Sequence, residues 1–198
     1  MSSFLKYIDL SQPSFYFSLA TILFNPIFWN IAARAEYNHH VLTNLAGGSA
    51  FKGCAALALS IFTLGLFRDY VYKMALESQP VHDLLGMAVV KALATVLFLV
   101  GNVLVLSSMW ALGFTGTYLG DYFGILMESR VTGFPFNVCE DPMYTGSTLS
   151  FLATALWYAS PAGLLLTFVV HLVYRAALRY ESPFTAMIYA NKDSRKQD

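Results

Sequence analysis

Two polar segments of the sequence contain the residue types that can perform chemistry. The first spans residues 130–147 and ends in Asp141-Pro-Met-Tyr144-Thr-Gly146-Ser. The second spans residues 179–185 and contains Glu181. Almost all the rest of the chain is apolar, and such a chain keeps dense polar, proline and glycine residues only where it meets water or performs a function. We therefore expect the functional site to lie where these two segments meet.

Carboxylates in or near these two polar segments can act as proton acceptors in catalysis. The available bases are Asp121, Glu140 and Asp141. Asp141 has a second possible role, because an Asp directly before a proline is a favoured start of a helix. The sequence leaves the choice of a catalytic base open.

The overall composition indicates an integral membrane protein with a single domain over residues 1–198. The chain is 57% hydrophobic and 12% charged, whereas soluble domains are usually about 25% charged. Its mean hydropathy is +0.54. The formal net charge is zero, which gives no indication of a nucleic-acid partner. Cys54 and Cys139 belong to no Cys/His cluster, so we expect no metal site. An oligomeric state is not specified.

The distribution of apolar residues predicts an all-α, polytopic membrane protein with four to five apolar helices. The main apolar runs are Ser14–Ala33, Ser49–Phe67, Leu84–Leu112 and Thr148–Leu178. Residues 34–48 and 68–83 are expected to be polar connections. Pro26 removes a helical hydrogen bond, so the first run should kink or break there. This run either spans the bilayer or lies within one leaflet; a cleaved signal peptide is a third, less favoured interpretation.

Glycines recur every three or four residues after the third apolar run, at positions 113, 116, 120 and 124. On a helix this spacing makes a narrow seam that permits close helix packing. A similar spacing occurs in dinucleotide-binding loops, but no strand precedes it here. We therefore predict helix packing and exclude a Rossmann-type fold.

The apolar run from Thr148 to Leu178 predicts a helical hairpin. One straight helix of this length would measure roughly 46 Å, whereas the hydrocarbon core of a bilayer is about 30 Å thick. Ser160-Pro161 divides the run near its middle. A turn at this point would bring Glu181 back to the level of Tyr144, and a single span would instead separate them.

The C-terminal segment is basic, which favours a cytosolic location for it. Five of the twelve basic residues lie there, namely Arg175, Arg179, Lys192, Arg195 and Lys196. The final Arg-Lys-Gln-Asp is similar to a dibasic endoplasmic-reticulum retrieval ending. The sequence thus predicts a multi-pass protein of the endoplasmic reticulum membrane, with a mitochondrial membrane as a second candidate.

Several motifs in the chain match those of one enzyme family. They include Phe24-Asn-Pro26, Leu119-Gly-Asp-Tyr-Phe-Gly-Ile125, Phe134-Pro-Phe-Asn137, Asp141-Pro-Met-Tyr144 and Pro183-Phe-Thr-Ala186. Over nearly its whole length the chain resembles the phospholipid N-methyltransferases. The resemblance implies methyl transfer from S-adenosylmethionine to the headgroup amine of phosphatidylethanolamine or its mono- and dimethylated forms, leading to phosphatidylcholine. The alternative is a non-enzymatic lipid-binding or transport protein of similar architecture.

The resemblance also implies residues that bind S-adenosylmethionine, and the chain departs from the family in two of them. The family has a Gly-x-Gly motif where this chain has Leu99, Val100 and Gly101, and a Glu-Glu pair where it has Glu181 and Ser182. We carry over Val100, Gly101 and Glu181 as binding residues. The roles of Leu99 and Ser182 remain open.

The motif around Tyr144 implies a further part of the cofactor site. Tyr144 would line the pocket, and Gly146 would allow close approach.

The lipid amine must lose a proton before it attacks, because a free alkylamine has a pKa of about 10.4. A methylated headgroup is a cation that favours aromatic walls. Candidates for such walls are Tyr118, Tyr122, Phe134 and Phe136.

Overall fold

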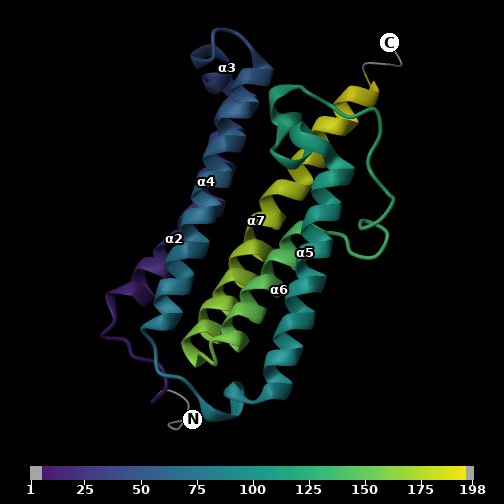
Figure 1. Cartoon of the computed structure of the whole chain (residues 1–198). Coiled ribbons are helices and arrows are strands. Elements are labelled where there is room, and N and C mark those ends of the chain that lie inside the picture. Colours follow the sequence, from purple (N-terminus) through teal and green to yellow (C-terminus); the bar gives the residue numbers. More distant parts are fainter. Residues whose placement is uncertain (1–5, 195–198) are drawn as a thin grey trace.

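Five apolar helices make up most of the computed structural model, which describes residues 6–194 (Figure 1). In chain order they are α2 (Pro13–His39), α4 (Ala50–Glu77), α5 (Ala88–Thr117), α6 (Pro142–Trp157) and α7 (Pro161–Ser194). The connections hold α3 (Val41–Leu45), η1 (Asp83–Gly86) and η2 (Gly120–Phe123). Residues 6–194 contain no strand, so the all-α prediction is confirmed. The predicted retrieval ending lies outside the described residues.

Four of these segments are long and apolar enough to cross a membrane. They are Pro13–His39, Ala50–Glu77, Ala88–Phe123 and Pro161–Lys192. Helix α6 has 16 residues and measures about 24 Å, which is shorter than the roughly 30 Å hydrocarbon core. The prediction of a polytopic membrane protein with four to five apolar helices is confirmed.

The sequence predicts a kink or a break at Pro26. The break does not occur, because helix α2 runs through Pro26 as one helix. Two side-chain amides support the backbone around the proline. Asn25 Nδ2 donates to the Leu64 carbonyl of α4 at 3.1 Å, and Asn30 Nδ2 donates to the Pro26 carbonyl at 3.1 Å. A proline is tolerated inside a membrane helix when neighbouring helices and polar side chains satisfy the nearby backbone groups.

The polar connection predicted for residues 68–83 begins later in the structure than the sequence predicted. Helix α4 continues to Glu77, and Arg68 is buried inside the bundle with 9% of its surface exposed. Its guanidinium donates from Nε and Nη2 to Asp69 Oδ1 and from Nη1 to the Tyr174 hydroxyl. A charged residue can remain in a membrane helix when such partners satisfy it.

The glycine seam predicted for residues 113–124 is not a helix face. Gly113 has a φ of 64°, which interrupts the regular helical geometry of α5. Gly120 begins η2, and Gly124, with a φ of 76°, follows its last residue. A Cβ on Gly120 would lie 2.7 Å from the Thr115 carbonyl oxygen. These glycines therefore permit tight turns, because glycine adopts left-handed backbone angles and leaves room for neighbouring backbone.

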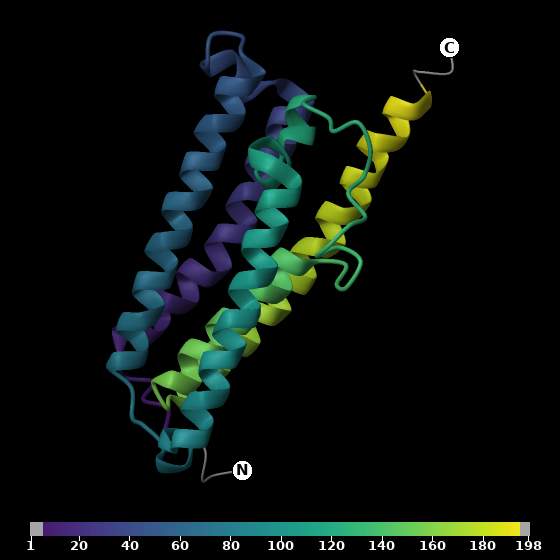
Figure 2. The same cartoon turned by 45° about the vertical axis from the view of Figure 1, so that its right-hand side comes forward.

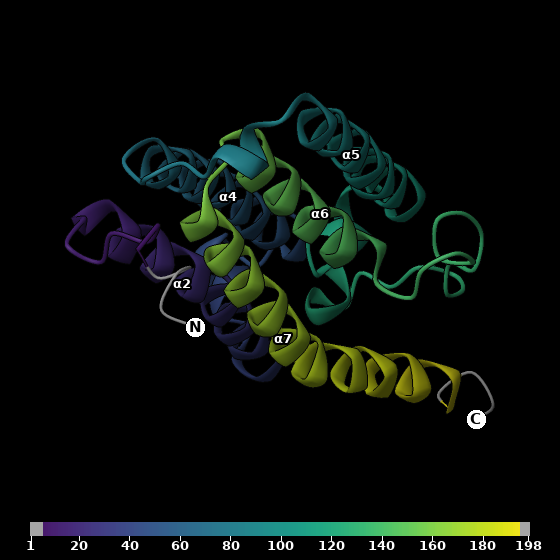
Figure 3. The same cartoon turned by 90° about the horizontal axis from the view of Figure 1, so that it is seen from below.

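Helices α6 and α7 form the predicted hairpin, and α6 lies between α5 and α7 (Figure 3). The turn occupies residues 158–160. Ala159 has a left-handed φ of 48°, and the Ser160 hydroxyl accepts from the Gly163 N–H at 3.1 Å. Pro161 then begins α7, which continues well beyond the start of α6 (Figure 2). The overhang places the second polar segment beside the first.

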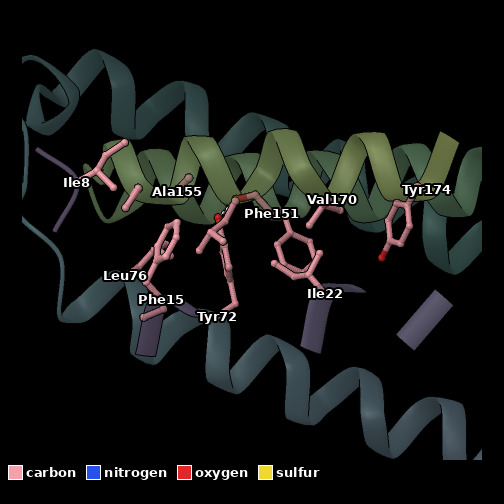
Figure 4. Packing of buried hydrophobic residues seen from close by; sticks show 12 residues of the cluster. Ile8, Phe15, Ile22, Tyr72, Leu76, Phe151, Ala155, Val170 and Tyr174 are labelled. Carbon is pink, nitrogen blue, oxygen red and sulfur yellow. Dashed lines mark hydrogen bonds between the residues drawn. The ribbon is translucent and has the colours of Figure 1, made fainter. Parts of the chain in front are cut away.

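The main hydrophobic core lies between this hairpin and the pair formed by α2 and α4 (Figure 4). Its labelled side chains from the four helices include Ile22, Tyr72, Phe151 and Val170. The Tyr72 hydroxyl oxygen lies 3.1 Å from the carbonyl oxygens of both Phe151 and Gly163, which share its single proton. This buried contact joins α4 to both arms of the hairpin and holds their register.

Candidate functional site

The two polar segments meet through a hydrogen bond between Tyr144 and Glu181. The Tyr144 hydroxyl, on the first turn of α6, donates to Glu181 Oε2 on α7 at 2.6 Å. Trp29 of α2 lies beside the pair, with its ring centroid 6.5 Å from that of Tyr144. Glu181 is partly buried and takes part in none of the ion pairs found within residues 6–194. No cationic side chain in this part of the chain therefore neutralises its carboxyl group.

Two further carboxylates make the surroundings of Glu181 acidic. Asp121 of η2 and Asp141 before α6 both lie close enough to act electrostatically on it. Asp121 is held in place by Thr185 of α7, whose hydroxyl donates to Asp121 Oδ2 at 2.9 Å. Partly buried carboxylates of like charge need a cation or hydrogen-bond donors to remain ionised. In the part of the chain that is described, no group of three or more His, Cys, Asp or Glu residues could hold a metal ion.

Of the three candidate bases, Asp141 lies directly before α6. It occupies the N-cap position of α6, but its side chain makes no capping hydrogen bond. Burial is the main cause that raises the pKa of the Asp141 carboxyl, the charge of Glu140 raises it further, and Arg175 and Arg130 oppose the shift. A raised pKa suits a carboxylate to proton transfer near neutral pH. Glu140 is exposed, and Asp121 is engaged by Thr185.

A pocket of about 270 Å³ opens between α6 and α7 next to this acidic region. It is lined by Asp141, Tyr144, Thr145, Thr148, Leu149, His171, Tyr174, Arg175 and Leu178. We did not predict His171 and Tyr174 as site residues. The available signal was a set of polar residues within an apolar run. Tyr174 and Arg175 follow His171 by three and four positions, which places each of them on the same helix face as His171.

Tyr174 links this pocket to the buried arginine. Its hydroxyl accepts from Arg68 Nη1 at 2.7 Å and lies 3.0 Å from the Ser147 hydroxyl oxygen. Its ring packs edge-on against Tyr144, with the centroids 5.0 Å apart. The Arg68 guanidinium also lies over the Phe151 ring, 4.8 Å from its centroid. Arg68 thus helps to hold Tyr174 in place. Tyr174 in turn packs against Tyr144, the residue whose hydroxyl binds Glu181.

Gly101 and Gly146 lie against each other where α5 crosses α6. A Cβ on Gly101 would lie 2.6 Å from the Gly146 carbonyl oxygen, and a Cβ on Gly146 would lie 2.5 Å from the Gly101 carbonyl oxygen. Residues two apart on a helix point in nearly opposite directions. The contact at Gly146 is therefore on the side of α6 away from the Tyr144 ring, and Gly101 supports α6 from behind.

The other residues expected at the site are more scattered. Leu99 is 59% exposed and Val100 is 46% exposed on α5, and Ser182 is exposed on α7. Among the four aromatic residues expected to form walls for the headgroup, no two form a ring contact within residues 6–194. Tyr122 instead stacks on Phe184, with the centroids 5.0 Å apart. The structure thus brings together Tyr144, Asp141, Asp121 and Glu181, with Gly101 and Gly146 behind them.

Comparison with known proteins identifies the family. The family model described as phospholipid methyltransferase matches residues 89–192. The chain is 56% identical to phosphatidyl-N-methylethanolamine N-methyltransferase of Saccharomyces cerevisiae, over 96% of this chain and 92% of the relative. It is 50% identical to phosphatidylethanolamine N-methyltransferase of Rattus norvegicus, over 98% of each chain. No solved structure matches significantly. The chain therefore belongs to the phospholipid methyltransferase family.

Proposed function

We propose that this membrane methyltransferase transfers methyl groups from S-adenosylmethionine to the headgroup amine of phosphatidylethanolamine or its mono- and dimethylated forms, on the route to phosphatidylcholine. The observation that carries the proposal is the Tyr144–Glu181 pair, which lies in an acidic region beside a pocket between α6 and α7. The relatives are named for these substrates, and the family membership disfavours a non-enzymatic lipid carrier.

The residues around Glu181 fit the methyl donor. S-adenosylmethionine supplies an electrophilic methyl group on a sulfonium and also carries a cationic amino group. Glu181 can bind such a cation because it is partly buried and has no ion-pair partner among the described residues. Tyr144 orients the Glu181 carboxylate through its hydrogen bond. Asp121 adds negative charge from η2.

The residues around Asp141 fit the acceptor. An amine that arrives protonated must lose its proton before it can attack, and Asp141 lines the pocket where it can accept that proton. Tyr144 lines the same pocket and also contacts Glu181, so the two substrates would meet at its ring. Holding both reactants in place can supply on the order of 7–11 kcal/mol of the barrier reduction.

A methyl-transfer assay tests the proposal directly. Purified protein in vesicles is incubated with methyl-labelled S-adenosylmethionine and, in turn, phosphatidylethanolamine, its monomethyl form and its dimethyl form. We expect label in at least one of these lipids and little in soluble ethanolamine, because the pocket lies between helices of a membrane bundle. The comparison across the three lipids also identifies the methylation steps. Turnover of soluble ethanolamine at the same rate as of the lipids would contradict the proposal.

We further propose that the protein resides in the endoplasmic reticulum membrane, with a mitochondrial membrane as the second candidate, and that the site faces the cytosol. Thr145 and Ser182 are both exposed and flank the site on the two arms of the hairpin. Single cysteines at these positions, with Cys54 and Cys139 replaced, should both react with an impermeant thiol reagent added outside sealed microsomes. Protection of either position until the membrane is permeabilised would rule out a cytosolic site.

A further inference from the structure

We propose that the pocket between α6 and α7 binds the phosphodiester of the lipid substrate, with Arg175 as its main cationic partner. This inference rests on the proposed function and assigns one part of the lipid to one part of the site. The pocket brings two nitrogen-bearing side chains from α7, His171 and Arg175, to the same wall. They are four residues apart and so lie one above the other on the helix.

Arg175 is suited to an anionic ligand because no ion pair holds its guanidinium in the described chain. It is exposed, and its charge acts on Asp141 at the same pocket. An arginine guanidinium presents a rigid set of N–H donors that matches phosphate oxygens in pairs. Arg68 does not line the pocket, and it is already bound to Asp69 and Tyr174.

The rest of the pocket matches the parts of the lipid that adjoin the phosphate. Leu149 and Leu178 provide apolar walls for the glycerol and the start of the acyl chains. Among residues 6–194, the Thr145 hydroxyl has only the Cys139 sulfur as a side-chain partner, at 3.2 Å, and a thiol is a weak hydrogen-bonding group. This hydroxyl is therefore available to a phosphate oxygen.

The position of the pocket also sets the direction of the headgroup. Asp141 and Tyr144 line it, and the Tyr144 hydroxyl reaches Glu181. A phosphate held by Arg175 would leave the short ethanolamine arm to extend past Asp141 toward the donor region. The amine would then lie where its proton can be accepted and where the methyl group is delivered.

A different explanation of Arg175 is simple snorkelling, in which a basic side chain contacts headgroups of any bulk lipid. Snorkelling predicts no selectivity for the substrate's own phosphate. The two explanations separate when the substrate phosphodiester is removed while the membrane is kept the same.

The test compares two acceptors in vesicles of constant composition. One is phosphatidyl-N-methylethanolamine, and the other is the matching diacylglycerol lipid in which an ether oxygen replaces the phosphodiester. We expect the unmodified protein to prefer the phosphodiester lipid in kcat/KM. In Arg175→Gln the ratio of kcat/KM for the two lipids should fall about tenfold or more, which is the scale of a charge-assisted hydrogen bond. The cause should be a higher KM for the phosphodiester lipid. The KM for S-adenosylmethionine should not change, which also shows that the variant is folded.

Two matched variants support the interpretation. Arg175→Lys should retain part of the preference, because it keeps the charge but not the paired donors. Arg179→Gln removes an exposed arginine one turn further along the same helix, outside the pocket, and should behave like the unmodified protein.

Several outcomes would overturn the inference. If Arg175→Gln kept the full preference for the phosphodiester lipid over the ether lipid, Arg175 would not bind the phosphate. A raised KM for the methyl donor with an unchanged lipid KM would assign the pocket to the donor. Equal use of soluble glycerophospho-N-methylethanolamine would show that the phosphate site is not specific to a lipid. Absence of methylation of every phosphatidylethanolamine form by the unmodified protein would refute the proposed function as well as the phosphate site.

Discussion

Gly101→Leu is expected to abolish measurable methyl transfer. A Cβ at this position would lie 2.6 Å from the Gly146 carbonyl oxygen and 2.9 Å from the Ser150 hydroxyl oxygen. Backbone cannot yield as a flexible side chain can, so α5 and α6 must move apart. Helix α6 bears Tyr144 and follows Asp141, and a displacement on the order of 1 Å at an active site can cost roughly 100-fold in rate. The measurement is the rate of labelled methyl incorporation into phosphatidyl-N-methylethanolamine.

Two variants control for nonspecific effects of changing a membrane helix. Gly65→Leu makes the same change in α4, where a Cβ at the glycine would meet nothing within 4 Å, and should remain active. Leu99→Gly restores the family pattern at an exposed position and should also remain active. The thermal stability of Gly101→Leu should fall, since overpacking typically costs about 1–3 kcal/mol. Full activity of Gly101→Leu would show that the contact between α5 and α6 is not required.

Glu181→Gln is expected to weaken binding of S-adenosylmethionine by about 1.5–3 kcal/mol, the scale of a hydrogen bond to a charged group. This corresponds to roughly 10- to 150-fold in Kd. The substitution keeps the size of the side chain and an oxygen that can accept from Tyr144, so it removes mainly the negative charge. Equilibrium binding of the labelled donor to purified protein measures the effect without requiring turnover.

Ser182→Ala is the matched control for this change, because Ser182 is the exposed neighbour of Glu181 on α7 and occupies the second position of the family's acidic pair. Its donor affinity should equal that of the unmodified protein. A Glu181→Gln variant with the same thermal stability and the same donor affinity as the unmodified protein would remove Glu181 from the binding site. Equal losses in both variants would point to a disturbance of α7 rather than to the loss of one charge.

The sequence determined those features that depend on local composition and length. An apolar run of residues 148–178 is too long for one upright span, and Ser160-Pro161 divides it, so a hairpin was predictable from helix geometry alone. The structure confirms the turn at residues 158–160 and the meeting of Tyr144 with Glu181. The concentration of polar residues in two segments likewise predicted the position of the candidate site, because polar groups are costly elsewhere in such a chain.

Only the tertiary structure decided the features that depend on a partner helix. Asn25, the neighbour of Pro26, bonds to the backbone of α4, and Arg68 is buried where Tyr174 of α7 meets it. The glycine spacing at residues 113–124 suggested a helix face, yet the chain turns there, since a glycine pattern permits both outcomes. Gly101 and Gly146 are 45 positions apart in the chain, and no local pattern joins them. Their contact arises from the crossing of two helices, and the backbone approach at that crossing sets the position of α6.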